Sequence, residues 1–326
     1  MRARSEVVDA DVRPEDLEPY RGELTGYCYR MVGSVFEADD AVQETMLRAW
    51  RSLDGFEGRS AVRSWLYRIA TNVCLDLLRG RKRRALAMDL GPSSPADGIL
   101  GPKLPDDAWV TPLPDARVQQ ADDDPAEVAA SREAVRLAFV TALQRLPARQ
   151  RAVLILRDVL RWHAREVAEL LETSVASVNS ALQRARATLA EHDVGPADAP
   201  ALDAEQEALL ARYVDTFERY DIGALVELLH EDAVMTMPPY DFWLEGPVEL
   251  GRWFLGQGRG CEGSRLVATA ANGGAAFGSY RPDGEGGRRP WAIQVLELAD
   301  GRVIGHHSFL DPRLFAAFGL PDHLPG

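Results

Sequence analysis

A long acidic, proline-rich stretch divides this chain into separate folding units. Residues 85–128 hold seven prolines and nine acidic residues against two basic ones. Proline lacks the backbone N–H that helices and sheets need, and unstructured connections of this length are uncommon inside one compact domain. We therefore predict a linker over residues 87–128. Some of its residues are too apolar for a free spacer and indicate that part of it lies along a surface: Ile99, Leu100, Leu104, Trp109, Val110 and Leu113.

Residues 14–86, before the linker, show helical periodicity. In a helix expected near residues 38–51, one side is predicted to be buried, with Val42, Met46, Ala49 and Trp50. Another side carries Asp40, Glu44 and Arg48 four residues apart, with Gln43 beside them. The spacing alone favours a solvated face with i,i+4 ion pairs. The alternative is a docking stripe for another protein.

Residues 202–326 are expected to form an α+β domain. A long amphipathic helix around Leu209–Phe217 precedes extended segments near 233–237, 265–271, 275–281, 290–298 and 302–309. The last two segments flank Asp300-Gly301, a favourable hairpin turn. The chain is thus predicted to be multidomain, with two all-α domains (14–86 and 129–192) and a C-terminal cone whose curved antiparallel sheet surrounds a cavity.

The net charge of −13 is unevenly distributed. Residues 59–84 hold eight basic groups and one acid, whereas residues 202–326 hold ten arginines and nineteen acids. Local positive patches, rather than total charge, set affinity for phosphates. No apolar run approaches the ~20 residues of a membrane span. The three cysteines lack metal-ligand spacing, so we expect reduced thiols, no metal, no cofactor and a cytoplasmic location.

Residues 165–186 have the pattern of a helix-turn-helix. Apolar positions from Val175 to Leu189 are spaced 4,3,4,3,4, and Ser174 is a suitable N-cap. The residues away from this seam suit base edges in a major groove or phosphates. They are Arg165, Ser177, Asn179, Ser180, Gln183, Arg184 and Arg186. The alternative is a helical hairpin that merely packs.

Residues 56–84 combine aromatic, cationic and amide side chains on one helical stretch. Opened DNA bases need planes to stack on and polar groups that read their edges, within a cationic groove. Taken alone, Trp65 and Tyr67 are more often core residues. The candidate single-strand contacts are Phe56, Arg59, Arg63, Trp65, Arg68, Asn72 and Arg79.

Three of these segments, taken in their order along the chain, resemble a known protein family. DAVQETMLRAW (40–50), RSWLYRIATNVCLDLLRGRKR (63–83) and the segment 146–186 closely resemble bacterial sigma factors of the extracytoplasmic-function group. The resemblance covers roughly residues 17–190. It implies that Asp40, Gln43, Glu44 and Arg48 bind the clamp of core RNA polymerase. It also implies that the second motif melts and reads the −10 element, and that the third reads the −35 element as duplex.

Residues 205–310 resemble, more weakly, the SnoaL-like and ketosteroid-isomerase-like cone. Enzymes of that fold use a pocket carboxylate as base. The loose catalytic candidates here are Tyr240, Asp241, His306, His307 and Asp311, although core histidines are the favoured interpretation. The candidate pocket residues are Tyr240, Trp243, Trp291, His306 and His307, with Trp253 as a further possible wall.

The leading hypothesis is a sigma factor that binds core polymerase, recognises −35 and −10 elements and promotes melting. Its C-terminal domain would be a built-in regulator that packs on the sigma domains, partly through an apolar tail (Phe309, Leu314, Phe315, Phe318, Leu320). The expected partners are core polymerase, promoter DNA as duplex and melted strand, and a candidate small-molecule ligand, with no membrane. Two alternatives stay open. One is a polymerase-independent helix-turn-helix regulator; the other is a bifunctional protein with a ligand-binding or catalytic cone.

Overall fold

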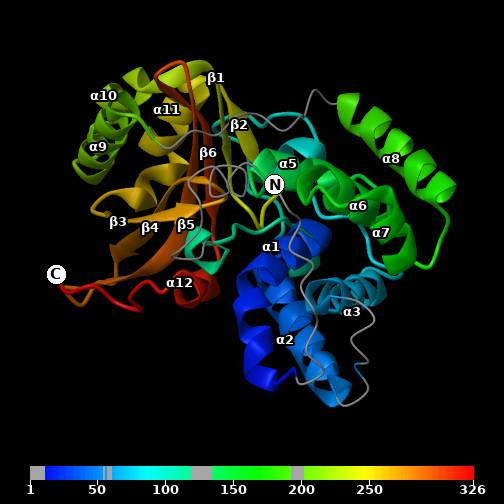
Figure 1. Cartoon of the computed structure of the whole chain (residues 1–326). Coiled ribbons are helices and arrows are strands. Elements are labelled where there is room, and N and C mark those ends of the chain that lie inside the picture. The colour runs from blue at the N-terminus through cyan, green and yellow to red at the C-terminus, as the bar shows by residue number, and fades with distance from the viewer. Residues whose placement is uncertain (1–11, 54–55, 57–60, 119–133, 192–201) are drawn as a thin grey trace. The chain divides into compact units, whose positions relative to one another are not determined.

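The computed structural model describes residues 12–53, 56, 61–118, 134–191 and 202–326. They form two compact units (Figure 1). The first comprises Met1–Arg81, Arg117–Ala121 and Ala138–Gly195, and the second comprises Lys82–Ala116, Asp122–Leu137 and Pro196–Gly326. No helix in the described ranges is long and apolar enough to cross a membrane.

The first unit is helical. The 3₁₀ turn η1 (Pro14–Tyr20) leads into α1 (Arg21–Val32), α2 (Val35–Arg51) and α3 (Val62–Leu77), which pack on one another. Tyr27 of α1 and Thr71 of α3 share a buried hydrogen bond of 2.7 Å between their hydroxyls. The remaining elements are α5 (Leu137–Gln144), α6 (Ala148–Leu154), the π-helical turn η6 (Ile155–Val159), α7 (Ala164–Leu170) and α8 (Val175–Ala190).

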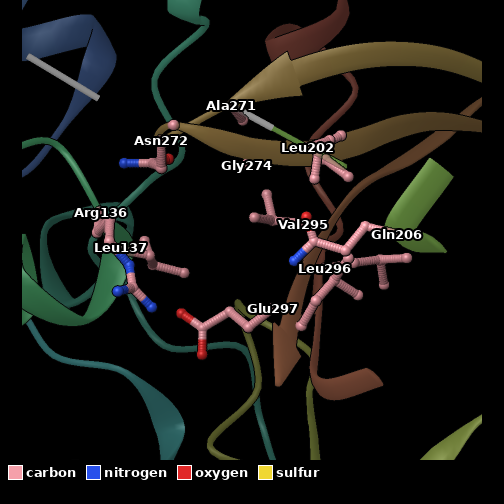
Figure 2. A pocket seen from close by; sticks show the side chains of 13 residues that line it. Arg136, Leu137, Leu202, Gln206, Ala271, Asn272, Gly274, Val295, Leu296 and Glu297 are labelled. Carbon is pink, nitrogen blue, oxygen red and sulfur yellow. The ribbon is translucent and has the colours of Figure 1, made fainter. Parts of the chain in front are cut away.

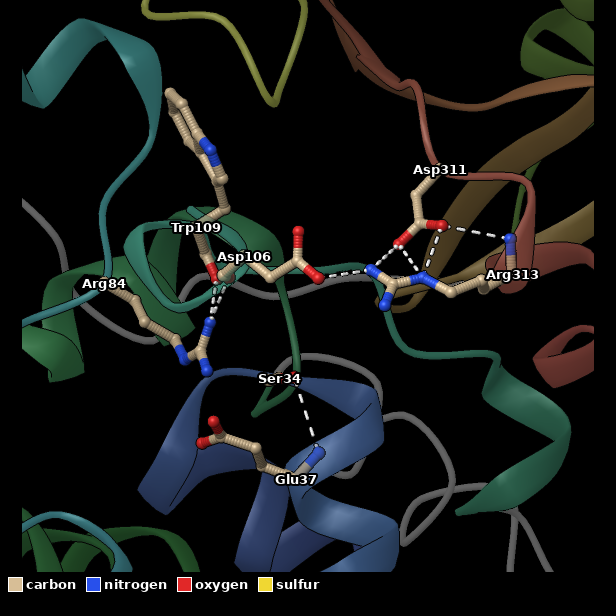
Figure 3. Close-up of polar contacts among 7 residues, drawn as sticks. All are labelled: Ser34, Glu37, Arg84, Asp106, Trp109, Asp311 and Arg313. Atoms are coloured by element: carbon tan, nitrogen blue, oxygen red, sulfur yellow. Dashed lines mark hydrogen bonds and ion pairs between the residues drawn. The ribbon is translucent and has the colours of Figure 1, made fainter. Parts of the chain in front are cut away.

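Helix capping explains where the key helices begin. Ser34 accepts a hydrogen bond from the backbone N–H of Glu37 at the start of α2 (Figure 3). Ser174 does the same for Ser177 at 3.1 Å, which confirms the cap predicted for α8. A serine cap satisfies one of the helix's otherwise unpaired donors and contributes about 1 kcal/mol. The buried side of α8 contains four of the five predicted seam residues, Val178, Leu182, Ala185 and Leu189; the prediction was wrong for Val175, which is 42% exposed in the first turn.

The second unit contains one six-stranded sheet in the order β2-β1-β6-β5-β4-β3. The strands are β1 (Leu229–Thr236), β2 (Trp243–Glu245), β3 (Arg265–Ala271), β4 (Gly274–Pro282), β5 (Arg288–Ala299) and β6 (Arg302–Phe309). All neighbours are antiparallel except β1 and β6, which pair in parallel. The sheet expected to be antiparallel therefore has one parallel pairing. The predicted turn is present, since Asp300 and Gly301 both have left-handed φ angles (50° and 68°).

The core of this second unit lies between the sheet and three helices. These are α9 (Ala204–Glu218), α10 (Ile222–Glu227) and α11 (Pro247–Leu255), and η7 (Gln257–Cys261) follows α11. Buried residues of the three helices cluster with Met235, Phe277, Leu296 and Val303 of the strands. Burial of a side chain of this size stabilises the fold by about 1.5–3 kcal/mol.

The apolar tail packs within its own unit. Phe315 of α12 (Arg313–Ala317) lies edge-on to Tyr280 of β4, with ring centroids 5.0 Å apart. A Cβ atom at Gly278 would meet the side chains of Phe315 and Leu320. Phe315 and Leu320, two of the five tail residues expected to contact the sigma domains, thus pack on the sheet of their own unit.

Most of the predicted linker also belongs to the second unit, and we call residues 84–116 the strap. Trp109, Val110 and Leu113 are buried, which confirms that part of the linker lies along a surface; Ile99 is 94% exposed, so that expectation is wrong for this residue. Short 3₁₀ turns, η3 (Ala87–Asp89), η4 (Asp106–Ala108) and η5 (Asp115–Arg117), interrupt it. Its last residues reach β3 through the bridge between Pro114 and Ala271.

Hydrogen bonds hold the strap along its length. The guanidinium of Arg84 donates to the carbonyls of Asp106 and Trp109 at 2.8 and 2.7 Å, and Arg313 donates to the Asp106 carboxylate at 2.6 Å (Figure 3). The N–H of Ala96 donates to Glu249 at 2.7 Å, which helps to lower the pKa of that carboxyl group. Further bonds join Ser94 to the Trp243 carbonyl, Leu104 to the Pro239 carbonyl, Leu113 to Asn272 and Gly273 to Asp115.

Candidate functional site

The outer side of α2 combines charge with exposed apolar surface. Asp40, Gln43 and Arg48 are exposed and Glu44 is half-buried. Arg48 donates to Glu44 at 2.6 Å, the i,i+4 pair that the spacing predicted. Sequence analysis placed Trp50 on the buried side, and this was wrong, because its side chain is 61% exposed next to Leu47, which is 41% exposed. Exposed aromatic and aliphatic side chains beside polar ones are typical of protein–protein contact surfaces.

One face of α3 presents polar side chains. Arg68, Asn72 and Arg79 are exposed, and Arg79 pairs with Asp76 at 2.9 Å. Neither Arg68 nor Asn72 has a side-chain partner among the residues that the structure describes, so both can contact a ligand without breaking an internal bond. The rings of Phe56 and Trp65 pack against each other near the start of the helix, with centroids 4.8 Å apart and planes tilted by 39°. Arg59 lies outside the described residues.

Arg63 differs from the other predicted single-strand contacts. It forms an ion pair with Glu23 at 2.7 Å and lies 5.4 Å from the Tyr67 ring and 5.8 Å from the Trp162 ring. Tyr67 is buried, which raises the pKa of its phenol, and its ring centroid lies 5.0 Å from that of Trp162. Arg63 thus holds α3 against the segment that precedes α7.

Arg151 of α6 makes a second buried connection inside the first unit. It donates to the Gln144 side chain at 2.6 Å, to the carbonyls of Gln144 and Leu146 at 3.1 Å, and to the carbonyl of Met31 in α1. Burial lowers the pKa of this guanidinium to about 10. A buried charge is tolerated only when hydrogen bonds replace its water, and here four carbonyl-type oxygens do so.

The exposed side of α8 carries the residues predicted to read duplex DNA. Ser177, Asn179, Ser180, Gln183, Arg184 and Arg186 are all exposed. Arg186 pairs with Asp158 at 2.7 Å, and Arg165 of α7 pairs with Glu169 at 3.0 Å. In the part of the chain that the structure describes, the side chains of Asn179, Ser180, Gln183 and Arg184 have no partner. The helix therefore presents free donors and acceptors of the types that can pair with base edges.

The cone of the second unit encloses a cavity of about 220 Å³. The cavity is lined by Tyr240, Trp291 and His306, which were predicted from the sequence, and by residues that were not predicted. Trp243 and His307 do not line it: the Trp243 indole donates to the Gly91 carbonyl at 2.9 Å, and His307 bonds Thr236 at 3.0 Å and faces Glu297 at 3.7 Å. Trp253, predicted as a further wall, also lines the cavity. The missed residues are Leu100, Met235, Met237, Phe254, Gln257, Gly258, Cys261, Arg281, Ala292, Gln294, Ser308 and Leu310.

His306 is held as a neutral imidazole. The Tyr213 hydroxyl donates to the Gln294 amide oxygen at 3.0 Å and must therefore accept from His306 Nε2 at 2.8 Å. Burial, with a smaller contribution from His307, lowers the pKa of His306 to about 4. The other ring nitrogen, Nδ1, is buried without a hydrogen-bond partner. No group of three or more His, Cys, Asp or Glu side chains in the described ranges could hold a metal ion.

Comparison with known proteins agrees with this organisation. Family models for sigma-70 region 2, sigma-70 region 4 and a SnoaL-like domain match residues 17–84, 136–189 and 210–306. The ECF RNA polymerase sigma factor SigG of Mycobacterium tuberculosis is 47% identical over 97% of this chain and 86% of its own length. SigJ of the same species is 28% identical over 94% of both chains.

The fold is also that of a solved sigma factor. The crystal structure of Mycobacterium tuberculosis SigJ gives a TM-score of 0.60 at 23% identity and covers 95% of this chain and 100% of the other. Helical regions 2 and 4 followed by an α+β domain are thus common to this chain and to SigJ. The chain belongs to the extracytoplasmic-function sigma factors, which bind RNA polymerase and give it promoter recognition.

Proposed function

We propose that three exposed helical faces divide the work of promoter recognition. The stripe on α2 (Asp40, Gln43, Glu44 and Arg48, extended by Leu47 and Trp50) docks on the polymerase clamp. The face of α3 with Arg68, Asn72 and Arg79 reads the melted −10 strand, with Phe56, Arg59, Arg63 and Trp65 at its entrance. The exposed side of α8 reads the −35 duplex, with Arg165 and Arg186 on phosphates.

The observation that carries this assignment is the set of unpartnered polar side chains on α3 and α8. Asn72 and Arg68 occupy one exposed line on α3, next to the packed rings of Phe56 and Trp65. Gln183 and Arg184 lie on the solvent side of α8, opposite a fully apolar seam. Stacking planes beside base-reading groups suit a single strand, whereas an amide and a guanidinium on a bare helix suit a major groove.

We further propose that regions 2 and 4 separate when the promoter is bound. Two elements about 25 base pairs apart are separated by roughly 85 Å along B-form DNA, at 3.4 Å per base pair. The two regions touch in this structure through Tyr67 and Trp162 and through Arg151. A 16-residue helix such as α8 is only about 24 Å long, so it cannot reach across that span while α7 stays packed on α3.

The C-terminal domain, in this proposal, regulates the sigma regions through the strap. The strap connects region 2 to region 4 in sequence, and several of its hydrogen bonds are made with the cone: Ala96 with Glu249, Asp106 with Arg313, and Leu113 with Asn272. A conformational change in the cone is therefore transmitted to the strap. Because the strap joins regions 2 and 4 in sequence, its mobility limits how far they can separate. We also place the protein in the cytoplasm, where the polymerase acts.

A binding role for the cone is better supported than a catalytic one. Proton abstraction by the ketosteroid-isomerase route needs a carboxylate in the pocket. None of the residues lining the described cavity is Asp or Glu, and Asp311 is paired with Arg313 at 2.7 Å. The domain is therefore proposed to bind a small molecule without turning it over.

Run-off transcription tests this regulatory role more cleanly with point variants than with truncation. Removing residues 203–326 would also remove Glu249, Asn272 and Arg313, which form hydrogen bonds with the strap, so truncation would disturb the strap itself. Arg313→Met removes the ion pairs with Asp106 and Asp311 and leaves the core intact. We expect its promoter-dependent transcription to change at least twofold relative to Arg219→Met, which removes a matched surface pair with Asp215. Equal activity of the two variants would count against regulation through the strap.

A further inference from the structure

Arg281 is a charged group inside the cone that no described acid neutralises. Its guanidinium lies 3.6 Å from the Trp291 ring centroid and donates to the Cys261 sulfur at 3.0 Å. Its Nε atom is buried without a hydrogen-bond partner. Among the described residues, no carboxylate lies within ion-pair distance of it. Stacking on an indole holds the guanidinium plane in one orientation while its donors remain under-used.

The other residues that line the cone cavity do not neutralise the charge of Arg281. The walls are apolar or aromatic, with Met235, Met237, Trp253 and Phe254, and the lining contains no acid. His306 is neutral and adds an acceptor, because its buried Nδ1 has no partner. A cationic donor without a counter-ion in such surroundings costs free energy unless an anion completes the site.

The size of the cavity limits what that anion can be. At about 30 Å³ for each water molecule in the liquid, 220 Å³ corresponds to roughly seven waters. This is room for one aromatic ring with an acidic substituent. We propose that the cone pocket binds a small aromatic carboxylate, with its carboxylate on the fork of Arg281 and its ring between the aromatic walls. The planar fork of arginine suits a carboxylate bidentately.

A second hollow in the same unit is less suitable. It measures about 160 Å³ and is lined by Arg136, Asn272, Val295 and Glu297, among others (Figure 2). Burial acts to raise the pKa of Glu297, but interaction with His307 and, to a smaller extent, the charge of Arg136 lower it on balance. Because the carboxylate of Glu297 offsets the charge of Arg136, this hollow has no uncompensated cation among its described residues for an anion to neutralise.

The strap closes one side of the cone pocket. Leu100 of the strap lines the cavity, and so does Gln257, whose amide donates to the strap carbonyls of Gly98 at 2.7 Å and Ala96 at 3.4 Å. A ligand in contact with Leu100 therefore stabilises the closed strap. This consequence rests on the proposed regulatory role, whereas the binding site itself does not.

The test uses 4-hydroxybenzoate as probe, 4-hydroxybenzamide as its neutral isostere, and the full chain. Isothermal titration at pH 7.5 should give saturable 1:1 binding of the acid, at least tenfold tighter than of the amide. Arg281→Met should weaken the acid at least tenfold and leave the amide unchanged. Arg289→Met, an exposed position on β5, is the matched control and should bind like the parent. Bound acid should also slow hydrogen exchange at residues 91–104.

No binding of the acid to the parent would overturn the proposal, as would equal affinities for acid and amide. The proposal would also be overturned if Arg281→Met bound the acid as tightly as the parent does while its far-ultraviolet circular dichroism was unchanged. Run-off transcription with and without the acid is a separate arm. Arg281-dependent binding without any effect on transcription would contradict the regulatory role and leave the binding site standing.

Discussion

The ring of Tyr67 in α3 lies 5.0 Å, centroid to centroid, from the ring of Trp162 in the segment before α7. Both side chains are buried, so a residue of α3, the helix that we propose reads the −10 strand, helps to form the contact with region 4. The guanidinium of Arg63 lies near both rings, 5.4 Å from Tyr67 and 5.8 Å from Trp162. The two DNA-binding regions are thus coupled by a small aromatic and cationic cluster.

Trp162→Ala should loosen this coupling. Loss of a buried tryptophan costs about 3–5 kcal/mol, and we expect faster hydrogen exchange in α3 around Tyr67 as well as in α7. Trp50→Ala is a matched control, since that side chain is 61% exposed, and should change stability by no more than about 0.5 kcal/mol. Unchanged exchange around Tyr67 in Trp162→Ala would show that the ring contact does not hold the two regions together.

Charge reversal on α2 should weaken association with core polymerase. Asp40→Lys with Glu44→Lys removes the acids of the docking stripe, and the fold should survive because Asp40 is exposed and the Glu44–Arg48 pair is worth only about 0.3–0.5 kcal/mol. Reversal of Glu169 and Glu172, exposed in α7 and just after it, is the control. In a pull-down with purified core polymerase, the α2 variant should no longer be retained, whereas the control variant should be. Equal retention of the two variants would contradict the docking assignment.

Replacing Gln183 or Arg184 by Ala should change promoter preference at −35 positions. A good base contact contributes about 1–3 kcal/mol of discrimination, which corresponds to a loss of about 5- to 150-fold between matched and mismatched sequences. Arg186→Ala should instead weaken all sequences alike, because a phosphate contact carries no base information. Competition binding of holoenzyme to promoter variants distinguishes the two patterns. Uniform weakening by Gln183→Ala would refute base readout at that position.

Asn72→Ala and Trp65→Ala should impair strand opening and leave −35 binding intact. Asn72 is exposed and unpartnered among the described residues, and Trp65 packs against Phe56. Base–aromatic stacking is worth about 1–3 kcal/mol per base, so permanganate reactivity of −10 thymines should fall about fivefold or more. Arg219→Met, just after α9 and outside the proposed DNA-binding faces, is the control for a surface substitution. Normal reactivity in both variants would rule out the melting role.

Stability of the cone should fall as pH drops from about 6.5 towards 4. The pKa of His306 is lowered to about 4 in the fold, so the folded state binds fewer protons than the unfolded state across this window. The neutral histidine thus contributes stability that is complete above pH 6.5 and decreases by about 2 kcal/mol at pH 5. His306→Gln should remove this part of the pH dependence. If the urea midpoint of unfolding shifts by the same amount between pH 7.5 and 5 in the parent and in His306→Gln, His306 does not cause this pH dependence.

The features predictable from sequence are those set by local patterns. The cap at Ser174 and the turn at Asp300-Gly301 each depend on a few neighbouring residues, and both are present. The burial predicted for Trp50 was wrong, because helical spacing shows which residues share a face of the helix but not where the neighbouring helices that cover this face end. The parallel pairing of β1 with β6 joins strands about seventy residues apart, and no local signal encodes such a pairing.

The cone pocket shows the same limit. Tyr240, Trp291 and His306 could be nominated as aromatic and histidine residues near predicted strands. Arg281 was missed, although a single arginine at the end of the apolar strand β4 was a detectable signal. Leu100 could not be foreseen, because it reaches the cavity from a linker well over one hundred residues away in sequence.

Run-off transcription by purified core polymerase, with and without this protein, tests the sigma assignment most directly. The template set comprises random genomic fragments, so that the promoter need not be known in advance. We predict discrete transcripts that appear only when the full chain is added and that disappear with the Asp40→Lys, Glu44→Lys variant. The same transcripts from core polymerase alone, or none with the full chain at saturating concentration, would contradict the account.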